Sequence, residues 1–298
     1  MQRVWPEWLW ALEASLEQGA TECREIPVNH GGPASRLITK CRICGERADH
    51  AFTARVLKKH EAEFVVCEGC GFLQANDPFW LNEAYEEAIA SADTGILTRN
   101  IKLSRIASAL FFWLFPRNSQ FLDLAGGYGI LVRLMRDVGF DFHWSDPYCN
   151  NLVSRGFEHE PQMMYEAITA FEVLEHTVRP IEFLENALAM TAKGTILFST
   201  ETFDGPPPLP TEWWYYAFPE GQHIAFFQPK TLRKIAEMLG RNLYSNGSLH
   251  LLTDQHVNPL LFKLLSDRFW SWPFYIAARI GMTSRTIEDH AAIIRRKA

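Results

Sequence analysis

The sequence has no dense cluster of lysine or arginine, no long uninterrupted apolar run, no internal repeat and no low-complexity tract. Its 29 basic residues are outnumbered by 35 acidic ones, which gives a formal net charge of −6 and a pI near 5.9. This balance offers no basic surface to a nucleic-acid backbone, so nucleic acid is disfavoured as a partner. The composition is 47% hydrophobic and 13% aromatic over 298 residues, which suffices for one large globular domain with a smaller one attached.

The apolar stretches are too short or too charged to cross a bilayer. The segment at 1–18 lacks the apolar run and cleavage site of a signal peptide, so we expect a cytoplasmic protein. The most apolar stretches are 108–116 and 259–281, and the second carries Lys263, Asp267 and Arg268. Peripheral membrane contact through their aromatic residues stays open as an alternative.

Four of the six cysteines form two Cys-x-x-Cys pairs, Cys41 with Cys44 and Cys67 with Cys70. A glycine follows each pair, at Gly45 and Gly71, and permits the tight turn that brings both thiolates to one ion. This spacing is typical of a zinc ribbon and predicts a structural Zn²⁺ with a closed shell of four thiolates. The alternatives are two disulfides, disfavoured in the cytoplasm, or a redox dithiol, which needs only one pair. Cys23 and Cys149 are expected to be ordinary buried or half-buried thiols.

Beyond Pro116 the apolar pattern alternates between short strands and helices. We expect strands at 120–125, 140–145, 166–173, 194–200, 241–246 and 249–253, and helices at 129–138, 181–191 and 229–239. This alternation predicts an α/β fold with a doubly wound, Rossmann-like parallel sheet. Helical apolar spacing at 77–95 and 99–115 predicts two helices that join the ribbon to this core.

A glycine-rich turn follows the first expected strand, where the chain reads FLDLAGGYG at 121–129. Ligands of doubly wound sheets bind beyond the carboxyl ends of the strands, so this turn is either a nucleotide-binding loop or a plain glycine turn. A dinucleotide fingerprint needs G-x-G-x-x-G, but from Gly127 the chain reads G-Y-G-I-L-V, which disfavours NAD. The segment resembles instead the first motif of class I S-adenosylmethionine-dependent methyltransferases, with Ala125 in place of the first glycine.

The resemblance implies a cofactor site. Asp146, at the tip of the second strand, is expected to accept both ribose hydroxyls. The segment YEAITAFEVLEHTVRPIEFLENAL at 165–188 resembles the fourth-strand motif of the same superfamily, which places Glu175 and His176 at the methionine end of the cleft. The adenine contact has no assigned residue, and Glu158 and Glu160 are candidates. The implied cofactor-binding residues are Asp123, Ala125, Gly126, Gly127, Gly129, Asp146, Pro147, Phe171, Glu172 and Val173.

A four-cysteine ribbon directly before such a core resembles sugar methyltransferases of nucleotide-sugar and surface-polysaccharide pathways. The implied acceptor is a sugar or nucleotide-linked sugar, methylated on oxygen or carbon. A ribosomal RNA methyltransferase with a ribbon is one alternative, which the acidic balance disfavours, and a non-catalytic cofactor-binding or ribbon interaction protein is another. The expected parts are an N-terminal extension (1–35), the ribbon (36–77), connecting helices (78–117), the methyltransferase core (118–253) and a C-terminal helical extension (254–298).

The stretch at 203–228, here called the aromatic insertion, is too long for a simple connection. It is expected to cover the cleft, where the aromatic residues 213–216 either stack on a sugar ring or pack into the core. A sugar hydroxyl or an activated carbon must lose a proton during methylation, and a cleft histidine is the natural base. His223 is the first choice, His176 the second, and Glu175 is expected to orient the imidazole.

Overall fold

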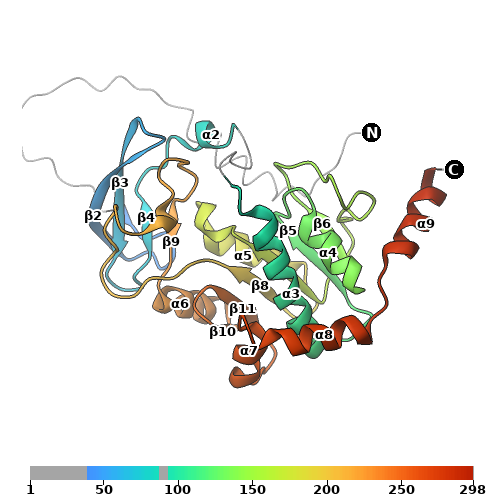
Figure 1. Ribbon diagram of the computed structural model, residues 1–298. Helices are drawn as coiled ribbons and strands as arrows, with labels where there is room; N and C mark the ends of the chain where they lie inside the picture. Colours follow the sequence, from blue (N-terminus) through green and yellow to red (C-terminus); the bar gives the residue numbers. More distant parts are fainter. Residues whose placement is uncertain (1–38, 87–92, 298) are drawn as a thin grey trace, which may run out of the picture.

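The computed structural model describes residues 39–86 and 93–297 (Figure 1). The strands predicted after Pro116 form a six-stranded sheet in it, and the predicted helices connect them. The strand order is β10-β11-β8-β7-β5-β6. The strands are β5 (Gln120–Leu124), β6 (Asp141–Ser145), β7 (Ala167–Phe171), β8 (Ile196–Ser199), β10 (Asn242–Ser245) and β11 (Leu249–Thr253). Expectations for residues 1–38, including Cys23, lie outside the described residues.

The sheet is parallel, as predicted, except at one edge. Strands β5, β6, β7 and β8 pair in parallel, whereas β11 pairs antiparallel with β8 and β10 antiparallel with β11. The reason is the short connection at 246–248, which makes β10 and β11 a hairpin and leaves no room for a crossover helix. The stretch at 154–164, between β6 and β7, forms no strand and contributes an isolated bridge between Trp144 and Glu158.

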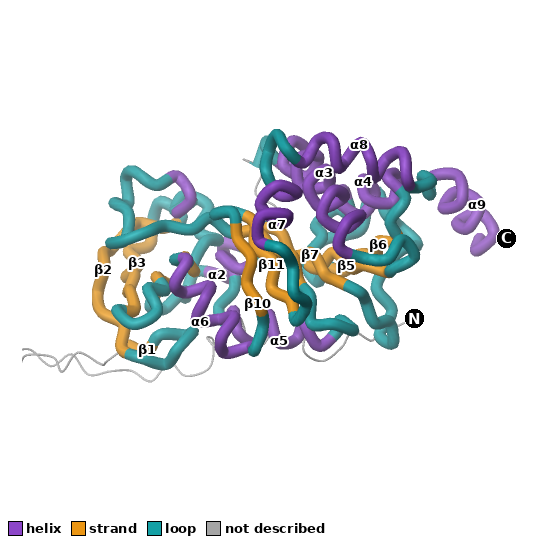
Figure 2. The backbone as a smooth tube through the Cα atoms, turned by 90° about the horizontal axis from the view of Figure 1, so that it is seen from below, coloured by secondary structure: helices purple, strands orange, loops and turns teal. Residues whose placement is uncertain are grey.

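Helices cover both faces of this sheet (Figure 2). One face carries α3 (Ile96–Leu114), α4 (Ile130–Val138), α7 (Pro259–Ser266) and α8 (Ser271–Gly281), and the other carries α5 (Pro180–Ala189) and α6 (Pro229–Leu239). Ala107, Leu110 and Phe111 of α3 are buried because spacings of three and four residues place them on one side of the helix. The helix predicted at 77–95 is only α2 (Leu81–Ala84) in the described part of the chain.

The ribbon has its own antiparallel sheet, and the aromatic insertion contributes a strand to it. The order is β1-β2-β3-β4-β9, formed by β1 (Thr39–Lys40), β2 (Arg47–Val56), β3 (His60–Cys67), β4 (Leu73–Ala75) and β9 (Ala225–Phe226). Leu73 pairs with Phe226, and Phe64 packs in the same core as Tyr216 and Phe226. The ribbon and the insertion are therefore one packed unit beside the larger sheet.

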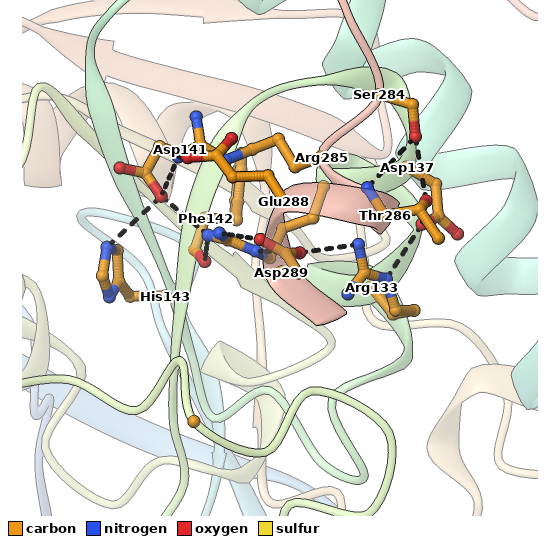
Figure 3. Close-up of polar contacts among 12 residues, drawn as sticks. Arg133, Asp137, Asp141, Phe142, His143, Ser284, Arg285, Thr286, Glu288 and Asp289 are labelled. Atoms are coloured by element: carbon orange, nitrogen blue, oxygen red, sulfur yellow. Dashed lines mark hydrogen bonds and ion pairs between the residues drawn. The ribbon is translucent and has the colours of Figure 1, made fainter. Parts of the chain in front are cut away.

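The last helix, α9 (Thr286–Lys297), is attached to the core by a buried ion pair (Figure 3). The Asp289 carboxylate faces Arg136 at 2.7 and 2.9 Å and Arg133 at 2.9 Å. Arg136 also binds Asp141 of β6 at 2.7 Å. Because Arg136 and Asp289 are both buried, each charge depends on the other to offset its desolvation. No helix in the described ranges is long and apolar enough to span a membrane.

Candidate active site

A cavity of about 900 Å³ opens beyond the carboxyl ends of β5, β6 and β7. The glycine loop lines one side and the aromatic insertion the opposite side, and α3 contributes Arg99 and Asn100. Most of the predicted cofactor-binding residues lie in its wall: Asp123, Ala125, Gly126, Gly127, Asp146, Pro147, Phe171, Glu172 and Val173. Gly129 and the adenine candidates Glu158 and Glu160 are not among the residues that line it.

The glycine loop turns sharply because three of its residues are left-handed. Ala125, Gly127 and Gly129 have φ values of 56°, 53° and 83°. Gly126 needs its missing side chain, since a Cβ there would lie 2.8 Å from Asp123 Oδ2 and 2.9 Å from Trp144 Cδ1. Its N–H donates to the Ser145 carbonyl at 3.1 Å, which holds the loop against β6. Gly129 begins α4 and serves the turn, which explains why it does not line the cavity.

Asp146 stands where the sequence predicts it, but the chain itself uses most of its carboxylate. Gly127 N–H donates to Oδ2 at 2.8 Å, and the N–H groups of Tyr148 and Cys149 each donate to Oδ1 at 2.8 Å. A carboxylate offers about four acceptor positions, so roughly one remains for a ligand. Asp146 therefore has room to accept one ribose hydroxyl, and not both as the resemblance implies.

Asp123 supports the loop from beneath. It is buried, and its Oδ1 accepts a 2.6 Å hydrogen bond from the Thr169 hydroxyl. Burial, which disfavours the charged form, raises its pKa to about 7 despite that bond. Glu172 is also held by the protein, since the Ser199 hydroxyl donates to its Oε1 at 2.6 Å.

The three predicted catalytic residues come together on the opposite side. Glu175 and His176 lie in the short helix η2 (Leu174–His176), and His223 lies two residues before β9. Their carboxylate and ring nitrogen atoms lie within 4.8 Å of one another. The imidazoles of His176 and His223 meet edge to face, with ring centroids 4.7 Å apart. Such a set of donors also resembles a divalent-metal site.

His223 has a defined tautomer. Its Nδ1 lies 2.6 Å from the Tyr215 carbonyl, which only accepts, so Nδ1 carries the proton and Nε2 keeps its lone pair. Burial lowers its pKa to about 4. The imidazole is therefore neutral at pH 7 and has one nitrogen free to accept a proton.

Glu175 is buried and His176 is half-buried, and neither has its full set of hydrogen-bond partners. Both carboxyl oxygens of Glu175 and the Nδ1 of His176 have no hydrogen-bond partner in the described part of the chain. Burial raises the pKa of Glu175 well above its usual range, and burial followed by His223 lowers that of His176. The Tyr215 and Thr200 hydroxyls lower the Glu175 pKa in part, although neither is in hydrogen-bond geometry with it. Burial thus favours the neutral form of Glu175, which lies behind the cavity wall, and its carboxyl makes no hydrogen bond to an imidazole of the described residues.

The ribbon and the segment directly after it hold the aromatic insertion in place. Trp80 Nε1 donates to the Gly221 carbonyl at 2.7 Å, and Leu57 N–H donates to the Phe218 carbonyl at 2.9 Å. Tyr215 and Tyr216 are buried, whereas Trp214 is 76% exposed beside the cavity. Of the two alternatives for residues 213–216, packing into the core holds for Tyr215 and Tyr216 and in part for Trp213, whereas Trp214 is exposed.

Sequence reasoning missed part of the wall. Tyr85 stacks on Tyr148 at 5.7 Å and meets His176 edge to face at 6.3 Å. Arg99 is paired in bidentate fashion with Asp93, at 3.1 and 2.6 Å. No motif marks these residues. The helical spacing of Ile96, Arg99, Asn100 and Leu103 is the one signal that could have located this wall on α3.

The four predicted metal-binding cysteines form a second cluster, in the ribbon. Their Sγ atoms all lie within 4.8 Å of one another, with Cys41 to Cys70 and Cys44 to Cys67 at 3.5 Å. Gly45 and Gly71 have φ values of 75° and 74°, and each donates its N–H to the carbonyl of the first cysteine of its pair. Tetrahedral zinc with Zn–S bonds of about 2.3 Å needs sulfurs roughly 3.8 Å apart, which this cluster fits.

Cys149 is half-buried at the cavity wall, and burial raises its pKa to about 12. It takes no part in the ribbon cluster.

Residues 98–246, half of the 298-residue chain, match the family described as Methyltransferase domain. The chain belongs to this methyltransferase family. This confirms the prediction that the fold is a Rossmann-like methyltransferase fold and the prediction that the protein is a methyltransferase. No curated protein matches the sequence.

Among solved structures, the methyltransferase is similar to TnmH, with a TM-score of 0.43 and 15% identity over 60% of this chain and 62% of that chain. It is also similar to magnesium protoporphyrin IX methyltransferase from Synechocystis PCC 6803 with bound S-adenosylmethionine (TM-score 0.37, 11% identity, 58% and 91% covered). Human N-acetylserotonin methyltransferase scores 0.39 with 16% identity and coverage of 59% and 65%. The chain thus spans under two thirds of the length of TnmH.

Proposed function

We propose that the protein transfers the methyl group of S-adenosylmethionine to a small-molecule acceptor, and that the acceptor is a sugar or nucleotide-linked sugar. The observation that carries the proposal is the two-sided cavity. One side has the glycine loop and Asp146, and the other has a neutral imidazole with a free nitrogen.

The residues present fit the cofactor. The loop at 125–127 carries no side chain larger than a methyl group, and Asp146 keeps about one acceptor position for a ribose hydroxyl. S-adenosylmethionine supplies an activated methyl group on a sulfonium. The protein's own part is to align the acceptor, exclude water and take up a proton.

His223 Nε2 is the proposed proton acceptor. The other nitrogen of the same ring, Nδ1, donates its proton to the Tyr215 carbonyl, so the ring is held in one orientation and one tautomer. Trp214, exposed at the mouth, offers a flat apolar face to a sugar ring. In the ribbon, the four thiolates are proposed to hold one Zn²⁺ in a closed shell that takes no part in the chemistry.

Incubation with methyl-labelled S-adenosylmethionine and a panel of neutral sugars, nucleotide-linked sugars and RNA tests the function. We expect label on a sugar. Label on RNA alone would favour the RNA methyltransferase alternative. Tight cofactor binding without label on any acceptor would favour a non-catalytic binding protein.

A further inference from the structure

The C-terminal extension exposes an apolar face that the proposed function does not use. Six large side chains of α7, α8 and the turn between them are at least half exposed: Leu260, Phe269, Trp270, Trp272, Ile276 and Ile280. Spacings of four residues place Trp272, Ile276 and Ile280 along one side of α8. A continuous exposed surface of large apolar residues is typical of an interaction site.

Cations accompany this face. Lys263 and Arg268 are exposed, and neither forms an ion pair within the described ranges. Arg268 lies over the Phe269 ring at 5.5 Å. The acid between them, Asp267, accepts the N–H groups of Phe269 and Trp270 at 2.7 and 2.9 Å and is thereby engaged with the backbone. Lys263 and Arg268 outnumber Asp267, so these three residues together carry a net positive charge in a chain whose net charge is −6.

We infer that this face binds the surface of an anionic lipid bilayer. Two tryptophans, Trp270 and Trp272, beside basic residues without ion pairs suit the boundary between lipid headgroups and acyl chains. There the rings enter the apolar layer and the cations meet lipid phosphates. A second copy of the chain fits less well. A two-fold interface would bring Lys263 and Arg268 of both copies toward each other, and the single Asp267 of each copy would offset only half of their charge.

The geometry leaves the active site accessible during such contact. The first half of α3 lines the cavity through Arg99 and Asn100, whereas Trp113 near its other end meets Phe274 of α8, with ring centroids 5.7 Å apart. Arg105 fixes α8 to α3, because it donates to the Ser271 hydroxyl and lies over the Trp272 ring. The lipid-facing surface therefore lies at the end of α3 away from the cavity (Figure 1).

Co-sedimentation of the full chain with phosphatidylcholine vesicles, with and without phosphatidylserine, tests the inference. We expect binding to the anionic vesicles that weakens with salt. Lys263→Gln with Arg268→Gln should weaken it ~25-fold, at ~5-fold per cation. Trp270→Ala with Trp272→Ala should weaken it at least ~10-fold. The matched control is Arg233→Gln with Met238→Ala on α6, an exposed cation and an exposed apolar residue on the other face of the sheet, and it should bind like the wild type.

Absence of wild-type binding, or equal loss in the α6 control, would overturn the inference. So would a dimer in lipid-free sedimentation that the tryptophan variant dissociates, since the face would then belong to a second copy. Thermal unfolding of each variant checks that it is folded. These measurements do not involve methyl transfer, so their outcome is independent of the proposed function.

Discussion

The four cysteines and the Glu175–His176–His223 group are both polar clusters, but their polar atoms differ in how many of them have partners within the protein. Each cysteine sulfur faces another at close range inside two backbone turns, and none of the four cysteines lines the cavity described above. The cleft group contains a buried carboxyl and an imidazole nitrogen without partners, beside a cavity of about 900 Å³. A closed cluster suits stability, whereas unsatisfied polar atoms at a cavity suit chemistry.

The two clusters are physically connected. The Thr231 hydroxyl donates to the Cys70 carbonyl at 2.7 Å, and β4, which follows the second cysteine pair, pairs with β9 just after His223. The ribbon is therefore part of the wall that positions the proposed base. Substitutions in the cysteine cluster should therefore disturb the Glu175–His176–His223 group, whereas substitutions in that group should leave the cysteine cluster intact.

The largest effect is expected from Cys67→Ser. A structural zinc contributes on the order of 10 kcal/mol to folding, so the variant should lose its metal, unfold the ribbon and lose methyl transfer. Elemental analysis and thermal unfolding measure this, with Cys149→Ser as the control that keeps one zinc per chain. A folded Cys67→Ser protein with full zinc would show that the cluster is not the metal site.

His223→Gln should lower the rate of methyl transfer ~10²- to 10⁴-fold and leave cofactor affinity nearly unchanged, because only the proton acceptor is lost. His176→Gln should differ in kind and weaken cofactor binding as well. Single-turnover rates and calorimetry separate the two effects.

The matched control for His223 is His250→Gln. His250 is buried, has its pKa lowered to about 4 by burial and contacts the Thr200 carbonyl at 3.0 Å, but it lies outside the cavity wall. It should lose stability and keep the rate. Full activity in folded His223→Gln would remove His223 from the mechanism, and raised protease sensitivity of the insertion would make its role structural.

Glu175→Gln should show a pH-dependent gain in stability. The folded-state pKa of Glu175 is raised by burial, so above about pH 4.5 the unfolded chain releases a proton that the folded chain keeps. Wild-type stability should therefore fall by ~1.4 kcal/mol per pH unit from this group until the folded pKa is passed. Denaturant unfolding of both proteins from pH 5 to 8 measures the difference, and a constant difference would mean that Glu175 is ionised in the fold.

The smallest effect is expected from Ala125→Gly. Ala125 is left-handed, which costs about 1–2 kcal/mol for a residue with a Cβ, while glycine loses more chain entropy on folding. The net gain should be below ~1 kcal/mol, with unchanged cofactor affinity. A loss of stability in chemical denaturation would mean that the alanine methyl packs usefully in the loop.

The sequence predicted those features that depend on local pattern. The spacing of the cysteines, the alternation of strands with helices and the glycine loop all follow from residues close together in the chain. The pairing of β4 with β9 did not, because a strand of two residues, Ala225 and Phe226, gives no indication of the distant strand with which it pairs. The sequence also did not predict that three backbone N–H groups donate to Asp146, because these bonds depend on how the following turn folds back.

Calorimetric titration of S-adenosylmethionine into the wild type and Asp146→Ala tests the central claim, that the loop side of the cavity is a cofactor site. We expect one site of micromolar-range affinity, weakened by ~2 kcal/mol in the variant through loss of a charge-assisted hydrogen bond. Thermal unfolding checks that the loop survives the substitution. Equal affinity of both proteins for S-adenosylmethionine, or equal affinity of the wild type for NAD, would contradict the claim.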